Sequence, residues 1–264
     1  MGVRTPISLE EVDTLFPSYK FTKLLPTQDG IIDTTYIVAN TTQSYILKKY
    51  ERNIADRVEK DKKVLSLLYA DGLNVSLCLE NSQGWYLYKK LEGSVPKVVQ
   101  IYHIQALARF MVKLHHSMCH IECKTPFISP TKIKTTLQYL KKNYYLYYIK
   151  LKPLKNYKDK SKTLIHGDIF KDNTVFHKGK IAVFDFIDAG CGSFVFDIAV
   201  ALISFKKNHL SSYFIDIFLN TYNQFNRKKI AKVELEKTIK VASIFYAMVR
   251  VDRYKNITKA KELL

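Results

Sequence analysis

Three polar residues near position 170 have the types and spacing that phosphoryl transfer needs. Asp168 closes the triplet His166-Gly-Asp, Asn173 follows five residues later, and Asp185 follows the apolar run 181–184. A carboxylate can accept the proton of an attacking hydroxyl, while an amide and a second carboxylate can hold Mg²⁺ beside the phosphates of a nucleotide. Mg²⁺ takes few protein oxygens and leaves places for phosphate and water, which suits this sparse set of ligands.

A purely structural interpretation competes with this one, because Asp168 and Asp185 could be turn residues that flank a hairpin. Either residue alone would suit a turn. Asp168, Asn173 and Asp185 together, at these intervals, favour the chemical interpretation.

The segments that must position these residues change character along the chain. Short β-rich runs separated by turn residues dominate the first part, with one helix expected from an N-cap at Asn53 to about residue 69. The remainder is mainly helical, with helices expected at 99–118, 132–149, 196–205, 211–225 and 232–254. The predicted fold class is therefore α+β. A small β-rich lobe over 1–90 would bind the nucleotide, and a helical lobe over 91–264 would carry the catalytic loop, the metal site and the acceptor site. A cleft between two lobes is a natural ligand site.

Length and composition are those of a folded globular protein, with 264 residues, 47% of them hydrophobic and 13% aromatic. No run approaches the roughly 20 apolar residues of a membrane-spanning helix, and Glu10, Glu11 and Asp13 interrupt any signal-peptide core. We therefore expect a cytoplasmic protein without a membrane partner.

Four cysteines (Cys78, Cys119, Cys123 and Cys191) in such a chain predict reduced thiols and no disulfide framework. His115, Cys119 and Cys123 share one helical face, which would fit a zinc site only with ligands from further elements. A helix end that is rich in His and Cys is the favoured interpretation.

The net charge of +18 indicates an affinity for anions, and the densest stretch is 132–162, with ten lysines and one acid. Tyrosines lie among these lysines, as in proteins that bind single-stranded nucleic acid. The favoured interpretation is a lysine-rich surface with inward tyrosines, without an obligate nucleic-acid partner.

The motif His166-Gly-Asp-x4-Asn173, followed by Asp185-Phe-x-Asp188-Ala-Gly-x-Gly and by Asp197-Ile-Ala, resembles the aminoglycoside phosphotransferase superfamily of small-molecule kinases. The resemblance implies a two-lobed protein-kinase-like fold, ATP and Mg²⁺ as cofactors, and a small hydroxylated substrate. It implies that Asp168 is the catalytic base, that Asn173 and Asp185 bind the metal, and that His166 and Asp197 support the loop.

In the first lobe, the run 45–48 resembles the family strand whose lysine, here Lys48, contacts the nucleotide phosphates. Gly30 marks a weak phosphate loop, and the segment from Lys89 through Leu91 to position 93 resembles the hinge whose backbone meets adenine. The acid that pairs with Lys48 stays open between Glu59 and Asp61.

The stretches 3–8, 30–38, 168–173 and 197–202 further resemble the homoserine kinases of this superfamily, which would place the chain in threonine biosynthesis. Asp33-Thr-Thr departs from their usual Glu-Asn-Thr/Ser-Asn. A homoserine site needs a cation for the carboxylate, for which Arg250 and Arg253 are candidates, and an anion for the ammonium, for which Asp188 is one.

Alternative acceptors are choline, ethanolamine and aminoglycosides. Choline would need an aromatic cage, and a polycationic aminoglycoside is poorly matched to a net charge of +18. A catalytically silent pseudokinase is an alternative of another class, which the complete set of Lys48, Asp168, Asn173 and Asp185 disfavours.

Overall fold

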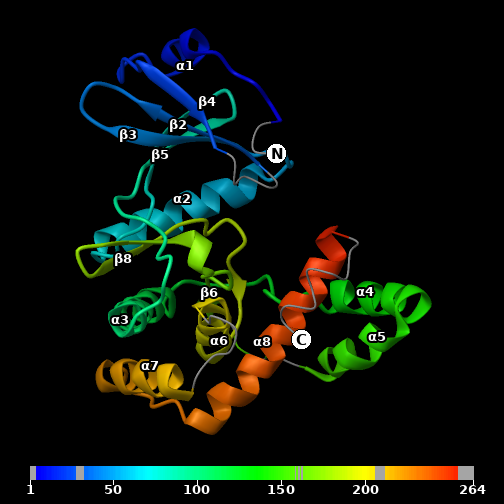
Figure 1. Cartoon of the computed structure of the whole chain (residues 1–264). Helices are drawn as coiled ribbons and strands as arrows, with labels where there is room; N and C mark the ends of the chain where they lie inside the picture. Colours follow the sequence, from blue (N-terminus) through cyan, green and yellow to red (C-terminus); the bar gives the residue numbers. More distant parts are fainter. Residues whose placement is uncertain are drawn as a thin grey trace. The chain divides into compact units, whose positions relative to one another are not determined.

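The computed structural model of the chain describes residues 4–27, 33–157, 159, 161, 163–205 and 212–254, with side chains up to 252. The chain divides into two compact units (Figure 1). The first comprises Met1–Glu92 with Ala182–Ile187, and the second comprises Gly93–Ile181 with Asp188–Leu264. The division predicted from sequence fell after residue 90 and did not assign 182–187 to the first lobe.

The first unit is built on a five-stranded antiparallel sheet of order β1-β2-β3-β5-β4. Its strands are β1 (Lys23–Pro26), β2 (Thr34–Ala39), β3 (Ser44–Lys49), β4 (Cys78–Ser82) and β5 (Trp85–Lys89). Successive side chains of a strand point to opposite faces. In β3, Tyr45 and Leu47 are buried in the core, so Lys48 lies on the other face.

A short helix, α1 (Leu9–Leu15), covers the core face of this sheet and was missed in the sequence-based prediction. Its first turn is closed by a capping box, in which Ser8 and Glu11 bond each other's backbone N–H groups. Val12 and Phe16 are fully buried against the sheet residues Tyr45 and Trp85, which explains why this short helix is stable.

Helix α2 (Ala55–Ala70) agrees with the predicted helix, but the predicted cap was wrong. The N-cap is Ile54, and no side chain caps the helix. The segment 182–187 adds to this unit through Val183, whose N–H donates to the Asn74 carbonyl at 3.0 Å and which forms a bridge with Val75. This anchoring places Asp185 in the first unit.

The second unit is mainly helical, as predicted. Its helices are α3 (Ile101–Met118), α4 (Pro130–Asn143), α5 (Tyr145–Leu151), α6 (Phe194–Phe205), α7 (Ser212–Phe225) and α8 (Lys232–Tyr254). α6 is apolar around most of its circumference and is buried among its neighbours, whereas α3 is amphipathic.

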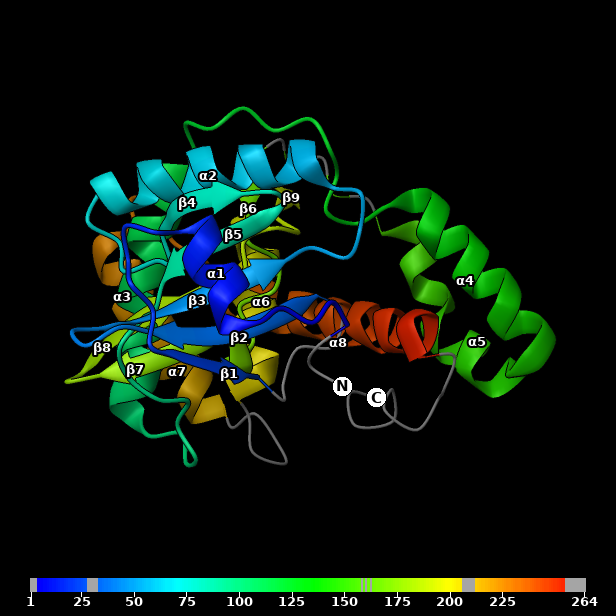
Figure 2. The same ribbon diagram turned by 90° about the horizontal axis from the view of Figure 1, so that it is seen from above.

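The helix predicted over 132–149 is two helices, which run side by side (Figure 2). Ser129 caps α4 through the N–H of Lys132, and Pro130 begins the helix. Tyr144 adopts φ −148° and ψ 66°, which ends α4 and starts α5. No glycine or proline marks this break, so the continuous apolar pattern concealed it.

Short strands frame the segment 166–173. β6 (Leu164–Ile165) pairs with β9 (Gly190–Cys191), the one-turn 3₁₀ helix η2 (Lys171–Asn173) ends this segment, and β7 (Thr174–His177) pairs with β8 (Lys180–Val183). A disulfide joins Cys123 to Cys191, so the prediction of reduced thiols was wrong for these two residues. Their separation of 68 positions gave no local signal of pairing. Within the described part of the chain, no helix is long and apolar enough to cross a membrane.

Candidate active site

The segment 166–173 leaves β6 through a tight backbone turn at Gly167. Gly167 has φ +75°, a conformation that side chains disfavour, and a Cβ at this position would overlap the ring of Phe127. The N–H of Asp168 donates to Nδ1 of His166 at 3.1 Å, which fixes the direction of the chain after the turn. Glycine is therefore required here for both conformation and space.

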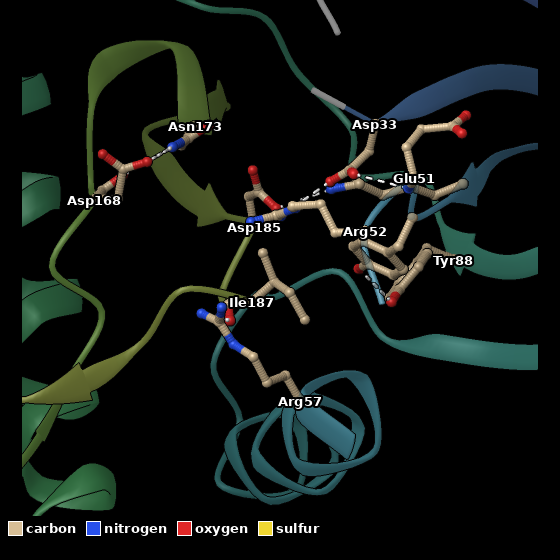
Figure 3. A network of polar contacts seen from close by, with 11 residues as sticks. Asp33, Glu51, Arg52, Arg57, Tyr88, Asp168, Asn173, Asp185 and Ile187 are labelled. Carbon is tan, nitrogen blue, oxygen red and sulfur yellow. Dashed lines mark hydrogen bonds and ion pairs between the residues drawn. The ribbon is translucent and has the colours of Figure 1, made fainter. Parts of the chain in front are cut away.

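Each carboxylate oxygen of Asp168 accepts a hydrogen bond from a different element. The hydroxyl of Tyr246, on α8, donates to Oδ1 at 3.0 Å and also to the carbonyl of Gly167. The amide of Asn173 donates to Oδ2 at 3.1 Å and to the Asp168 carbonyl at 2.8 Å, as Figure 3 shows for the carboxylate contact. Because both donated bonds use the amide nitrogen, the amide oxygen of Asn173 is turned away from Asp168.

Asp197, at the start of α6, holds the motif from behind. It is fully buried, and its carboxylate accepts from the N–H of Gly167 at 2.7 Å and from the N–H of His166 at 3.3 Å. Nε2 of His115 lies 3.2 Å from the same carboxylate, and Nδ1 of His115 lies 2.8 Å from the hydroxyl of Tyr222. This buried network ties the motif to α3, α6 and α7, and it commits His115 to packing.

Lys48 and Asp185 form an ion pair in the first unit, with Nζ and Oδ1 2.9 Å apart. Burial by itself would lower the pKa of Lys48, but the charge of Asp185 outweighs it and the pKa is raised above its usual value. Lys48 is therefore a fixed cation. Its Nζ also lies 4.9 Å from the centre of the Tyr50 ring, a cation–π distance.

The backbone of Asp185 is in the left-handed region, with φ +68°. A residue other than glycine there costs on the order of 1–3 kcal/mol and is found mainly at functional positions. The anchoring of Val183 on one side supports this conformation, and on the other side Arg57 donates to the carbonyl of Ile187 at 3.1 Å. Figure 3 shows Arg57 reaching this carbonyl from α2.

Neither acid suggested from the sequence as a partner of Lys48 is seen bonded to it. Glu59 pairs with Lys62 at 3.1 Å, and Asp61 is buried on the inner face of α2. The charge of Asp61 contributes to raising the pKa values of Tyr50 and Tyr88, after burial as the main cause for both.

A second polar cluster of the first unit includes Asp33, the position at which the sequence departs from the homoserine kinase pattern. The buried carboxylate of Asp33 accepts from Arg52 at 3.2 Å and from the N–H of Glu51 at 3.2 Å (Figure 3). The two hydroxyls of Tyr50 and Tyr88 lie 2.9 Å apart. These bonds fix the residues that follow β3, next to Lys48.

The predicted hinge residues differ in what their backbones do. The N–H of Lys89 donates to Leu77 at 2.8 Å, and its carbonyl accepts from Ser76 at 2.8 Å. The Lys89 N–H is thus used within the sheet, which argues against it as an adenine contact. Leu91 is 9% exposed and remains a predicted contact. Gly30 lies outside the described residues.

The predicted acceptor residues lie on two segments of the second unit. Asp188 and Arg250 are partly exposed, and Arg250 follows Tyr246 by four residues on α8. The side chain of Arg253 lies outside the described residues. Tyr246 was missed because nothing local in the sequence distinguishes it; its spacing of one helical turn from Arg250 was the available signal.

The polar residues thus form two groups. Lys48 and Asp185 contact each other in the first unit, while Asp168, Asn173, His166 and Asp197 are connected in the second unit.

A protein-family model described as "Phosphotransferase enzyme family" matches residues 23–231. Among curated proteins, the homoserine kinase of Polaromonas naphthalenivorans (strain CJ2) is 23% identical over 255 residues, covering 84% of this chain and 80% of the relative. The homoserine kinase of Janthinobacterium sp. (strain Marseille) is 22% identical and covers 76% of this chain and 71% of its own length.

Solved structures share the fold. Amicoumacin kinase hAmiN in complex with AMP-PNP, Ca²⁺ and Ami has a TM-score of 0.74 at 17% identity, covering 97% of this chain and 91% of its own. Macrolide 2'-phosphotransferase MphH of Brachybacterium faecium has a TM-score of 0.69 at 14% identity, with 98% and 97% coverage. The predicted fold class, a two-lobed protein-kinase-like α+β fold, is confirmed.

Proposed function

This chain belongs to the phosphotransferase enzyme family, and from that premise we propose that it is an ATP-dependent kinase that converts homoserine to O-phosphohomoserine. The observation that supports the chemistry best is the Asp168 carboxylate, which Tyr246 and Asn173 hold by one oxygen each. A carboxylate fixed in this way can meet a substrate hydroxyl without first reorganising.

Asp168 is the proposed base. It accepts the proton of the substrate hydroxyl as the oxygen attacks the γ-phosphorus of ATP, and ADP leaves with the electrons of the broken bond. Its two hydrogen bonds orient the carboxylate, and Asp197 holds the backbone N–H groups just before it. Lys48 is proposed to contact the phosphates of ATP, and the backbone of Leu91 to meet the adenine.

Asn173 and Asp185 are the proposed Mg²⁺ ligands. Their donor set, one amide oxygen and one carboxylate, is the hard oxygen chemistry that Mg²⁺ prefers. The amide oxygen of Asn173 is turned away from Asp168, as a ligand requires, and the ion pair of Asp185 uses Oδ1. When bound, the metal would neutralise the charge of the phosphates.

The homoserine assignment depends on α8. Tyr246 contacts the base, and Arg250 lies four residues later on the same helical face. Four residues span about 6 Å along a helix. The hydroxyl and carboxylate of homoserine are separated by roughly 5 Å on standard bond lengths. A hydroxyl at Asp168 would thus bring the carboxylate within reach of Arg250, with Arg253 and Asp188 as further proposed contacts. The names of the two curated relatives support the same acceptor.

Other acceptors are a second proposal within the same chemistry. Two further solved structures of the same fold are described as complexes with kanamycin and gentamicin. Their identities of 15% and 16% support the fold and no substrate of this chain. The net charge of +18 also opposes a polycationic acceptor. A cytoplasmic location stays a prediction.

The test is ADP release measured against homoserine, choline, ethanolamine, sugars and aminoglycosides. We expect turnover with homoserine, and a loss of about 10²–10⁴-fold in kcat for Asp168→Ala, the range for removing a general base. Asp172→Ala is the matched control, because Asp172 is an exposed acid of the same loop. ATP binding should persist in both variants.

The outcomes separate the alternatives. Turnover of another acceptor but not homoserine would refute homoserine as the substrate and leave the kinase assignment in place. ATP binding without turnover of any acceptor would indicate a pseudokinase. Equal loss in Asp168→Ala and Asp172→Ala would refute Asp168 as the base.

A further inference from the structure

The α4–α5 hairpin is the most one-sidedly charged part of the described chain. Residues 123–158 contain nine lysines and no acidic residue. None of the catalytic or acceptor residues proposed above belongs to this segment. Its charge therefore has no explanation in the kinase chemistry.

A cavity of about 750 Å³ opens in this region, entirely within the second unit. Pockets that bind small molecules typically have volumes of roughly 300–1,000 Å³. Apolar side chains from several elements line it, among them Leu137 of α4, Leu154 of the 3₁₀ helix η1 (Lys152–Asn156), and Phe196 of α6. Asp168 and Asn173 do not line it, so it is separate from the catalytic loop's polar groups.

Lysines surround this apolar lining. Four of them line the cavity and are exposed, namely Lys134, Lys141, Lys152 and Lys155. None of the four forms an ion pair with another described residue. Lysine stems pack on apolar surface while their ammonium groups stay in water, so the cavity presents an apolar interior with a cationic rim.

The acid in the lining, Asp159, is already occupied by protein groups. Its carboxylate accepts from the N–H of Ser193 at 2.8 Å and from the N–H of Ser161 at 2.9 Å. Burial, and after it the charge of Asp159, raises the pKa of Tyr157 to about 12. Asp159 thus serves the local fold and leaves the rim lysines uncompensated.

An exposed apolar surface adjoins the cavity on α5. Tyr145 is 58% exposed, Leu146 is 77% exposed and Ile149 is 39% exposed. The ring of Tyr145 lies 5.8 Å from that of Tyr148, which lines the cavity. Figure 2 shows α5 beside α4, away from α3 and α7 of the same unit. Contiguous exposed apolar residues on a protein surface indicate an interaction site.

We propose that this cavity binds an amphipathic anion, with an apolar chain inside and a phosphate or carboxylate head on the rim lysines. A nucleic acid fits less well, because the aromatic rings that line the cavity are buried, as in Phe196, or half-buried, as in Phe127 and Tyr157, and so expose little stacking surface to a base. The site is independent of the proposed kinase activity, and its lipid form would depart from the sequence-based expectation of no membrane partner.

Charge reversal on the rim is the first test, with dodecyl phosphate below its micelle concentration as the probe and calorimetry as the readout. Lys134→Glu with Lys141→Glu should weaken binding about tenfold or more, since hydrogen bonds to charged groups are the stronger kind. Lys237→Glu with Lys240→Glu makes the same change of net charge at exposed positions of α8 and should leave binding unchanged. Dodecanol, which lacks the charge, should bind weakly to every variant.

Filling the cavity is the second test. Gln138 is exposed and lines the cavity, so Gln138→Trp should block it without disturbing the core. Gln224→Trp, at an exposed position of α7, is the matched control. Circular dichroism of each variant checks that the fold is retained.

Sedimentation with phosphatidylcholine vesicles, with and without phosphatidylglycerol, identifies the source of the ligand. Binding of the probe alone supports a free amphiphile, and binding of anionic vesicles that the rim variant loses supports a lipid. Equal probe affinity in the rim, filling and control variants would overturn the proposal. Displacement of the probe by a single-stranded oligonucleotide at equal affinity would also overturn it, because the site would then be a general polyanion surface.

Discussion

Tyr246 and Asp168 are 78 positions apart in the chain, and the tyrosine hydroxyl donates to the carboxylate at 3.0 Å. The tyrosine is 7% exposed, and its ring packs edge-on against Phe170 at 4.6 Å between centroids. The last helix of the described chain therefore sets the orientation of the proposed base, together with Asn173.

Removing this hydroxyl should slow the reaction and leave nucleotide binding intact. Tyr246→Phe keeps the ring contact with Phe170 and deletes the hydrogen bond, so we expect kcat to fall about tenfold, the effect of one charge-assisted bond. Steady-state kinetics with a separate measurement of KM for ATP checks this. Tyr213→Phe is the control, because Tyr213 is 60% exposed on α7. Equal kcat in both variants would exclude a positioning role for Tyr246.

Loss of the Asp197 carboxylate should destabilise the second unit. Asp197→Ala leaves the N–H groups of His166 and Gly167 without their acceptor, at about 1–3 kcal/mol for each buried group. Urea unfolding measures the change. Asp216→Ala, which breaks a partly exposed pair with Lys232, should cost about 0–1 kcal/mol. Similar losses in the two variants would contradict the bracing role.

Lys48 and Lys49 should differ sharply in function although they are adjacent. Lys48 pairs with Asp185, whereas Nζ of Lys49 lies 5.2 Å from the centre of the Trp85 ring. Lys48→Met should raise KM for ATP and lower kcat by about two orders of magnitude, the scale of a preorganised electrostatic contact. Lys49→Met should retain activity within a few-fold. ADP-release kinetics of the two variants measure the effect. A larger loss in Lys49→Met than in Lys48→Met would assign the phosphate contact to Lys49.

Protonation of His103 should weaken the fold in mild acid. Burial lowers the pKa of His103 below its ordinary value of 6.5. Its Nδ1 also accepts from the N–H of Gln100 at 2.9 Å, which a protonated ring cannot do. The folded state thus takes up its proton at lower pH than the unfolded state. The contribution of the neutral His103 ring to the free energy of unfolding is complete above pH 6.5. It is lost as the pH falls from 6.5 through the folded-state pKa.

Unfolding free energies measured across this range should therefore decline toward acid in the wild type. The decline should be shallower in His103→Gln. His177→Gln, at an exposed position, should follow the wild type. Parallel curves for wild type and His103→Gln would show that another group titrates.

Chelation should abolish turnover, and Mg²⁺ should restore it. Asn173→Ala and Asp185→Ala should each raise the Mg²⁺ concentration needed for half-maximal rate by about tenfold or more, since each removes one of few protein ligands. Asp172→Ala is the control, because Asp172 is an exposed acid outside the proposed ligand and acceptor residues. Mg²⁺ titration of the rate measures the effect; an unchanged requirement in Asn173→Ala would remove that residue from the ligand set.

Local features of the fold and the site could be predicted from sequence. The resemblance placed Lys48 on a strand, which is β3, and the helical period gave α8 its observed bounds. The prediction failed where tertiary contacts decide. α1 is short and depends on burial of Val12 and Phe16 beneath the sheet, and the break at Tyr144 interrupts a regular pattern.

Long-range partners in the site were likewise invisible in the sequence. Neither Tyr246 nor the Asp185 partner of Lys48, 137 positions away, follows from local spacing. The Asp61 and Glu59 alternatives were chosen by reach along one helix, whereas the observed pair joins β3 to a segment that returns to the first unit from the far end of the catalytic motif.

The bond between Cys123 and Cys191 closes a covalent ring that contains α4, α5 and the whole stretch from His166 to Asp185. A protease that nicks the backbone once at the exposed Lys141 or Lys142 opens the ring without releasing a fragment. The nicked chain would migrate as a single species on a gel until a thiol reductant is added, and as two pieces afterwards.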